Sequence, residues 1–456
     1  MRNLIAVPLL TALAAFAGCA STPMPDLLAP TPDHWRHDVA DAGTPTDLHG
    51  WWHVFDDPAL DALVDEALAH SLLPREAMAR LRAARALHGE ADARFLPQLS
   101  ARTEDIPDPD ANASFFVAGF DAQWELDLFG RRGAAQRVAR GELDAAASDV
   151  RAANVSLVAE VTRDWLALRA AQQQTQWLER IRDARARELG MLRTRERLRL
   201  VDEADVRRAE AALAQAEAAP VESHDAIDEN AERLATLLGR AEPDPAWFQA
   251  APMPSLGAWR LDTAPADLLR SRPEILRAQA DVLRAAGEAG LAKAERYPNV
   301  ALGGSLAWST SLQQGPRTDG HTLASVGPII DIPLFDWGMR AARADAKEHE
   351  LEASALAYRQ AVLQGVAEVE TSLGRLSRQA EYEHRCADAA AAMDEASRIV
   401  ARRAEYRLAD PMQASESDIA YDQVAVALVQ AKESHALAFV ALFKALGGAP
   451  LPVEPG

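Results

Sequence analysis

The sequence predicts a mixed α and β fold built from two copies of one unit, in which a pair of strands is followed by a long helix. Phe129-Gly130 and Trp337-Gly338 are equivalent because 338 − 130 = 208. Apolar positions keep this offset after each glycine, as Trp165 and Leu373 do. Two pairs of segments alternate like strands, and residues 132–197 and 339–409 contain no proline. Two internal structural repeats follow from these observations.

The repeat sets the expected domain organisation, in which each half of the chain has the same order of elements. The expected segments are a signal peptide (1–18), an N-terminal arm (19–57), a helical segment of repeat 1 (58–96), hairpin 1 (97–129), the long and return helices of repeat 1 (130–240), a linker (241–272), a helical segment of repeat 2 (273–297), hairpin 2 (298–336), the long and return helices of repeat 2 (337–448) and a tail (449–456).

The N-terminus has the pattern of an export signal. Arg2 precedes an apolar stretch over residues 4–16, which is too short to span a bilayer comfortably. The stretch ends in Phe16-Ala17-Gly18-Cys19, which resembles the lipobox of bacterial lipoproteins. This resemblance implies cleavage before Cys19, covalent lipid on that cysteine and sorting to the outer membrane, because Ala20 follows it and not an aspartate. An ordinary secretory signal with a chance cysteine is the alternative.

Composition excludes several classes of protein. The net charge of −20 argues against nucleic acid as a partner. With Cys19 lipidated, Cys386 is the one remaining thiol, and we expect it to be a small packing residue in a helix. The mature chain then has no disulfide and no cysteine metal site, and we expect no cofactor besides the lipid.

The strand segments match membrane strands in length and alternation. Phe116 to Leu126 and Val300 to Trp308 alternate apolar and polar or small residues, and a partner strand covers residues 324–332. The segment 99–106 is the poorest strand, because it carries Arg102 and Glu104. Segments of about ten residues fit a tilted transmembrane strand, although a soluble β-sandwich would look similar.

Four strands cannot close a membrane barrel alone, because the smallest barrels need about eight. Open strand edges are excluded in lipid. If the barrel exists, several chains must share it, and a homotrimer with about twelve strands is the simplest solution.

The proline-free stretches predict long helices. Apolar residues between Leu351 and Leu376 follow the spacing 4-3-4-4-3-4-3, which is close to a coiled-coil repeat. Return helices are predicted over residues 203–238 and 412–446, before Gly239 and Gly447. Such helices need neighbours to bury their apolar faces, but a soluble coiled-coil spacer would show the same pattern.

The chain also resembles a known family, the bacterial outer membrane efflux proteins (TolC-like outer membrane factors), in its lipoprotein branch serving RND-type tripartite pumps. The resemblance covers nearly the whole mature chain. The matching segments, in chain order, are Trp52-His53-Val54-Phe55-Asp56-Asp57-Pro58, Phe95-Leu96-Pro97-Gln98-Leu99, Trp124-Glu125-Leu126-Asp127-Leu128-Phe129-Gly130-Arg131, Arg272-Pro273-Glu274-Ile275, Tyr297-Pro298-Asn299-Val300, residues 327–338 and Ala445-Leu446-Gly447-Gly448.

This resemblance implies a trimer whose outer-membrane β-barrel, with four strands per chain, continues as a periplasmic α-helical barrel. It implies a passive exit channel that docks a periplasmic membrane-fusion adaptor and an inner-membrane RND-type transporter. The two helix turns would form the tip, where adaptor-docking residues are expected (Arg199, Leu200, Arg407 and Leu408). The family usually has a glycine where this chain has Val201 and Ala409, which predicts a differently wound turn.

Two acidic residues near these turns are candidates for a pore constriction. Asp418 stands where the family carries a pore-lining aspartate, and Asp205 takes the matching part in the first repeat. A threefold ring would bring three carboxylates together. Alternatively, both are solvated charges near helix starts, where the macrodipole favours them.

Enzyme chemistry has no support in the sequence, which lacks a glycine-rich phosphate loop and the Gly-x-Ser-x-Gly and His-Glu-x-x-His patterns. A metal site is conceivable at His34 and His37 or at His49 and His53, but exposed bystander histidines are the simpler interpretation. Two other functions stay open: the outer-membrane channel of a type I protein secretion system, and a lipid-anchored periplasmic coiled-coil scaffold.

The lipid anchor can be tested directly. Cys19→Ser removes the thiol that would be acylated, so the precursor should stay uncleaved or mislocalised. Metabolic labelling with a radioactive fatty acid checks this, and label on the variant protein would rule out the anchor.

Overall fold

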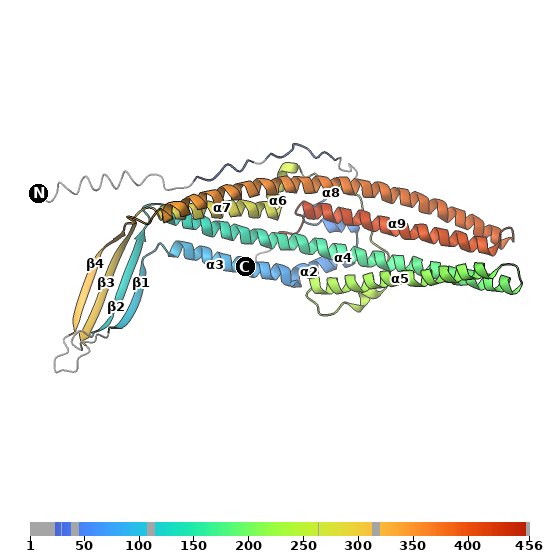
Figure 1. Cartoon of the computed structure of the whole chain (residues 1–456), viewed down its shortest axis with the longest axis horizontal. Coiled ribbons are helices and arrows are strands. Elements are labelled where there is room, and N and C mark those ends of the chain that lie inside the picture. Colours follow the sequence, from blue (N-terminus) through green and yellow to red (C-terminus); the bar gives the residue numbers. More distant parts are fainter. Residues whose placement is uncertain are drawn as a thin grey trace. The chain divides into compact units, whose positions relative to one another are not determined.

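The computed structural model describes residues 23–28, 30–37, 45–106, 115–262, 264–311 and 320–452. Cys19 and the signal segment 1–18 lie outside these residues. The described chain is mostly helical and contains one small sheet (Figure 1). It divides into two compact units, with 79–148 and 274–361 in the first and 30–78, 149–273 and 362–456 in the second.

The elements follow the predicted order, with short 3-10 turns between some of them. The helices are α2 (Pro58–His70), α3 (Leu72–Ala93), α4 (Arg131–Arg197), α5 (Glu203–Leu237), α6 (Leu268–Ser271), α7 (Pro273–Ala294), α8 (Met339–Glu405) and α9 (Pro411–Ala445). The strands are β1 (Gln98–Ile106), β2 (Phe115–Leu126), β3 (Asn299–Ser311) and β4 (His321–Asp331).

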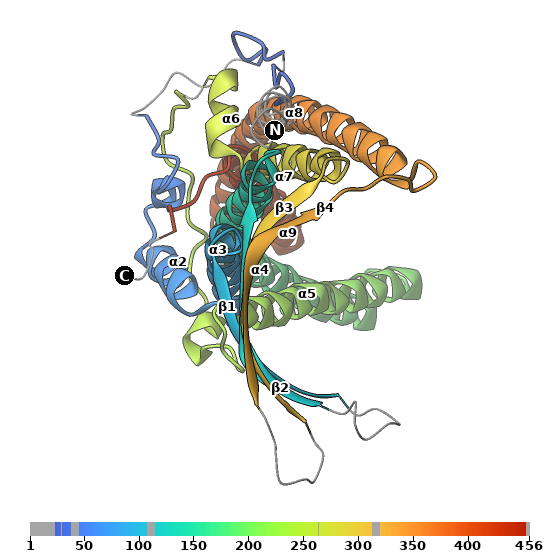
Figure 2. The same ribbon diagram turned by 90° about the vertical axis from the view of Figure 1, so that its left-hand side faces the viewer.

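The four strands belong to the first unit and form one antiparallel sheet in the order β1-β2-β3-β4. Figure 2 shows that this sheet is curved. The β2–β3 pairing joins the two hairpins, with Phe120 opposite Leu306 and Gln123 opposite Gly303. Strands β1 and β4 are the two edges of the sheet.

The registers place apolar residues of all four strands on one face. In register from β1 to β4, the residues Ala101, Phe120, Leu306 and Ala324 lie side by side on this face. Among the side chains that the structure describes, this face carries no charge, and Leu99, Phe120, Leu306, Val326 and Ile330 on it are exposed.

The opposite face of the sheet is polar along its first hairpin. Arg102, Glu104, Asp121, Gln123 and Glu125 lie on it. Arg102 Nε is 3.4 Å from Asp121 Oδ2, and Nη1 is 3.8 Å from Glu104 Oε2. A sheet with one apolar and one polar face, both of them open, has the side-chain pattern of a membrane barrel wall.

Helix starts use the expected capping chemistry. The Asp57 carboxylate accepts a hydrogen bond from the N–H of Ala59, and Pro58 is the first residue of α2. Asp202 caps α5 and Asp410 caps α9 in the same way. As predicted for the return helix over residues 203–238, α5 continues through Pro220, although proline usually disrupts a helix.

The second unit is packed around aromatic side chains. Trp51 stacks on Phe443, with ring centroids 5.7 Å apart, and Phe439 lies between Trp51, Phe55 and Trp259. Of the spaced apolar positions of α8 in this unit, Val362, Val369, Leu373 and Leu376 are buried and Val366 is half-buried. Elsewhere in this unit, a smaller core is formed by Ile181 and Ala184 of α4, Ala216 of α5 and Ile419 of α9.

In the first unit, α4 and α7 approach so closely that only glycine fits. A Cβ at Gly141 would lie 2.6 Å from the backbone nitrogen of Arg284, and a Cβ at Gly287 would lie 2.6 Å from the backbone nitrogen of Val138. The atoms nearest to each added Cβ include backbone atoms of the partner helix, so a larger residue at either site would force the two helices apart.

Gly287→Ala should therefore lower the free energy of unfolding by about 1–3 kcal/mol through overpacking. Gly133→Ala is the matched control, because nothing lies within 4 Å of its Cβ position in α4. The control should raise stability by about 0.4–1 kcal/mol. Thermal unfolding of the full-length protein in detergent measures both, and equal melting temperatures would contradict the close approach.

Candidate functional site

Two turns join the long helices to their return helices, α4 to α5 and α8 to α9, and both lie in the second unit. In each turn the long helix ends with a residue in the left-handed region, Arg199 with φ 58° and Arg407 with φ 59°. The N–H of Leu200 donates to the Arg195 carbonyl at 2.9 Å, and the N–H of Leu408 donates to the Arg403 carbonyl at 2.7 Å. These are Schellman ends, in which glycine usually takes the left-handed position.

The sequence predicted a differently wound turn, because Val201 and Ala409 stand where the family usually has glycine. In the structure the positive φ falls two residues before each of these positions, on an arginine in each turn. In each turn the N–H of the arginine and the N–H of the following leucine both donate to carbonyls of the helix end. These hydrogen bonds hold the arginine in the left-handed region, at some cost in conformational energy.

The turns present apolar side chains to solvent. Leu200 is 69% exposed and Leu408 is 68% exposed. Leu198 and Tyr406, which precede the two arginines, are exposed as well. The residues predicted for adaptor docking, Arg199, Leu200, Arg407 and Leu408, thus form matching sets on the two turns.

An ion pair links the two turns. Arg195, in the last turn of α4, donates from Nη2 to both carboxylate oxygens of Asp410 at 2.7 Å and 2.6 Å. Asp410 also accepts the N–H of Met412 as the cap of α9. The Arg195 hydrogen bond and this backbone N–H lower the pKa of Asp410. No sequence pattern pointed to this contact, because its partners are 215 residues apart.

Asp418 lies two turns into α9 and is partly buried. Its Oδ1 accepts a hydrogen bond from the Ser397 hydroxyl of α8. A groove beside it is lined by residues of α4 and α9, among them Arg187 and Arg195. One turn further on, Asp422 is buried, and its Oδ1 is 3.0 Å from Arg180 Nη2. Burial raises the pKa of Asp422, while Arg180 opposes that rise and Asp418 adds to it.

Asp205 has a different environment. It lies in the first turn of α5, its N–H donates to the capping Asp202 and its carboxylate pairs with Arg208. The hydrogen bond from Arg208 lowers the pKa of Asp205. In the described chain Asp205 and Asp418 have separate partners, so the structure does not bring the two candidates together.

The histidines do not form a metal site. Among the described residues, no group of three or more His, Cys, Asp or Glu side chains could hold a metal ion. His53 Nδ1 is 2.7 Å from the Asp61 carboxylate, and His37 packs against the helix position of Gly374. Cys386 is a half-buried free thiol in α8.

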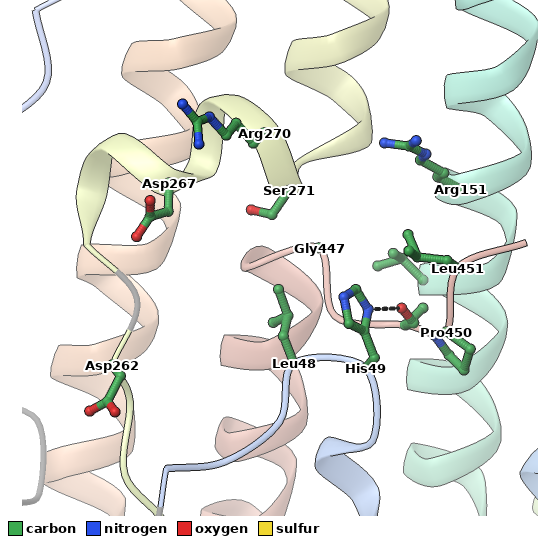
Figure 3. Close-up of a pocket in the computed structure, with 12 residues that line it drawn as sticks. Leu48, His49, Arg151, Asp262, Asp267, Arg270, Ser271, Gly447, Pro450 and Leu451 are labelled. Atoms are coloured by element: carbon green, nitrogen blue, oxygen red, sulfur yellow. Dashed lines mark hydrogen bonds between the residues drawn. The ribbon is translucent and has the colours of Figure 1, made fainter.

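A cavity of about 420 Å³ lies in the second unit, between the arm, the linker and the C-terminal segment (Figure 3). His49 Nδ1 is 2.6 Å from the Ala449 carbonyl oxygen, which ties the arm to the C-terminal segment. Arg151 and Arg270 share its lining with Asp262 and Asp267, so the charges are mixed. Arg260 binds Asp262, and Asp267 accepts the N–H of Ala264. The acidic groups therefore have structural roles, and the lining shows no catalytic arrangement.

The link between the turns gives a testable expectation. Asp410→Asn keeps a good helix cap but loses the ion pair, so the amides at the start of α9 should exchange faster with solvent. Because the pKa of Asp410 is lowered in the folded chain, the same loosening should appear in the wild type as pH falls through that pKa. Hydrogen exchange with mass spectrometry measures it. Arg207→Gln, which breaks ion pairs within α5 only, is the control; an equal effect there would contradict the link.

Comparison with known proteins agrees with this architecture. The profile of the outer membrane efflux protein family matches residues 63–240 and 264–448. The pyoverdine export outer membrane protein OpmQ of Pseudomonas aeruginosa is 28% identical over 403 residues, 82% of each chain. The solvent efflux pump outer membrane protein SrpC of Pseudomonas putida is 27% identical over 330 residues, 70% of each chain.

Solved structures show the same fold. The outer-membrane channel OprN superposes with a TM-score of 0.80 at 27% identity, over 94% of this chain and 100% of that chain. The MtrE outer membrane channel of Neisseria gonorrhoeae gives 0.79 at 23% identity, over 94% and 98%. The relatives are channels and not enzymes. The chain therefore belongs to the outer membrane efflux protein family, as an outer-membrane efflux channel protein that extends into the periplasm.

Proposed function

We propose that this chain is the exit duct of a tripartite efflux pump, in which three copies share one barrel and conduct small molecules passively out of the cell. The observation that carries the proposal is the four-stranded sheet, which has two edge strands and one face without charge among its described side chains. In lipid every backbone polar group needs a partner, so such a sheet requires further copies to close it. Three copies supply about twelve strands, within the range of known membrane barrels.

The helical part supports the second half of the proposal. We expect the long helices of three copies to form a barrel in the periplasm, with the domain organisation predicted from the sequence. The exposed leucines of the two turns (Leu198, Leu200 and Leu408) would meet a membrane-fusion adaptor, since exposed apolar side chains in matching sets suit a protein contact. An inner-membrane RND-type transporter would supply the energy. Acyl chains on Cys19 would anchor the arm in outer-membrane lipid.

Two alternatives make different predictions. A type I secretion channel would conduct unfolded protein from an ABC exporter; the relatives named for pyoverdine export and solvent efflux favour small molecules instead. A lipid-anchored periplasmic scaffold would never insert its hairpins. The uncharged face of the sheet disfavours the scaffold, because such a face has no stable place in water.

The proposal is tested by assembly and conductance. Protein extracted in mild detergent should be a trimer by light scattering and should open discrete conductance steps in a planar bilayer. A monomer that retains its strands in lipid, or a trimer that never conducts, would refute it.

The same recordings test the pore role of Asp418. Three carboxylates at a narrow axis should bind cations, so Asp418→Ala should raise single-channel conductance and weaken block by divalent cations. Glu416→Ala is the matched control, because this exposed carboxylate lies on the same helix two residues earlier. If both variants conduct like the wild type, Asp418 does not line the constriction.

A further inference from the structure

The two hairpins of the sheet repeat each other in register as well as in sequence. Residues of β1 correspond to residues of β3 at an offset of 299 − 98 = 201, taken from the first residue of each strand. Residues of β2 correspond to residues of β4 at the offset of 208 that relates Gly130 to Gly338. The pair Arg102–Gly119 then becomes Gly303–Gly327, which is indeed a pair in the second hairpin.

The pairing of β2 with β3 within one chain can therefore be used to infer how β4 pairs with β1 of the next copy. Within one chain β2 pairs with β3, with Gln123 opposite Gly303 and Ala122 opposite Gly304. The same offsets convert these pairs into Asp331 opposite Arg102 and Ile330 opposite Thr103. We propose that β4 of one chain pairs with β1 of the next copy in this register, with Asp331 and Arg102 as an ion pair across the subunit boundary. The inference rests on the proposed trimer.

The side-chain faces agree with this register. Ile330 and Thr103 belong to the uncharged face of the sheet, and Asp331 and Arg102 belong to the polar face. The proposed pairing keeps both faces continuous from one copy to the next. A slip by one residue would mix the faces, because side chains alternate along a strand.

A slip of the pairing by two residues would also keep both faces of the sheet continuous. The charges at the two strand edges distinguish the proposed register from such slips. The Arg102 side chain is 62% exposed and lies at the β1 edge, and among the described residues its ion-pair contacts are the loose ones to Asp121 and Glu104. Asp331 is exposed at the β4 edge and has no ion-pair partner among the described residues. Slips by two would set Ile329 or Pro333 opposite Arg102, whereas the proposed register sets opposite charges together.

Cysteine pairs test the register in full-length protein carrying Cys386→Ser. Thr103→Cys with Ile330→Cys should give covalent trimers on mild oxidation. The matched controls on the same face are Ala101→Cys with Ile330→Cys and Thr103→Cys with Ile332→Cys, which report the two slipped registers. Cross-links within one chain are excluded, because three strand spacings separate β1 from β4 by about 14 Å, beyond the reach of a disulfide.

Charge reversal tests the ion pair. Arg102→Asp or Asp331→Arg alone should lower the temperature at which the detergent-extracted trimer dissociates, and the two together should restore it. Asp121→Asn, which weakens one of the two contacts of Arg102 within its own chain and leaves Asp331 unchanged, is the control and should not be rescued by a change at residue 331.

The outcomes distinguish this inference from the proposed function. If light scattering finds no trimer, the proposed function fails and the register falls with it. If the trimer forms but a control pair cross-links in place of Thr103 and Ile330, the register alone is overturned. Failure of the swapped charges to restore the dissociation temperature would overturn the ion pair.

Discussion

Backbone hydrogen bonding at the two edges of the sheet is the constraint on which the rest of the molecule depends. Strands β2 and β3 pair on both sides, but β1 and β4 each have one neighbour in the chain. In water such edges risk uncontrolled pairing, and in hydrocarbon they cannot exist unpaired. The apolar face points to hydrocarbon, so the need for partner strands is built into the chain. In the proposed function, oligomeric assembly then follows from this local chemistry.

The helices could largely be predicted from the sequence, since their signals are local. Long stretches without proline and closing glycines located α4, α5, α8 and α9 within a few residues. The strands were also located, including the poor one with Arg102, because alternation reports which side chains share a face. Periodicity reports nothing about which distant segments meet. The Arg195–Asp410 link and the aromatic core around Trp51 and Phe443 were therefore not found.

The candidate site was predicted less well than the fold. The sequence pointed to the two turns and predicted an unusual winding from the missing glycine, but it did not locate the residue with left-handed backbone. The structure gives that conformation to Arg199 and Arg407. Asp205 and Asp418 were predicted to play matching parts near the two turns, yet one pairs with an arginine of its own helix and the other accepts a serine hydroxyl from α8. Sequence repeats align backbone positions, while side-chain environments diverge with each substitution.

The shared register of the two hairpins bears on how such a chain could have arisen. A chain of half this length, with one hairpin and one pair of helices, would present the same kind of strand edge on both sides. Six copies of it could meet through equivalent junctions. Every separate molecule that joins a ring loses translational and rotational freedom, which opposes association. Fusing two units into one chain halves the number of molecules that must meet, and it lets the two halves diverge, as Arg102 and Gly303 already have.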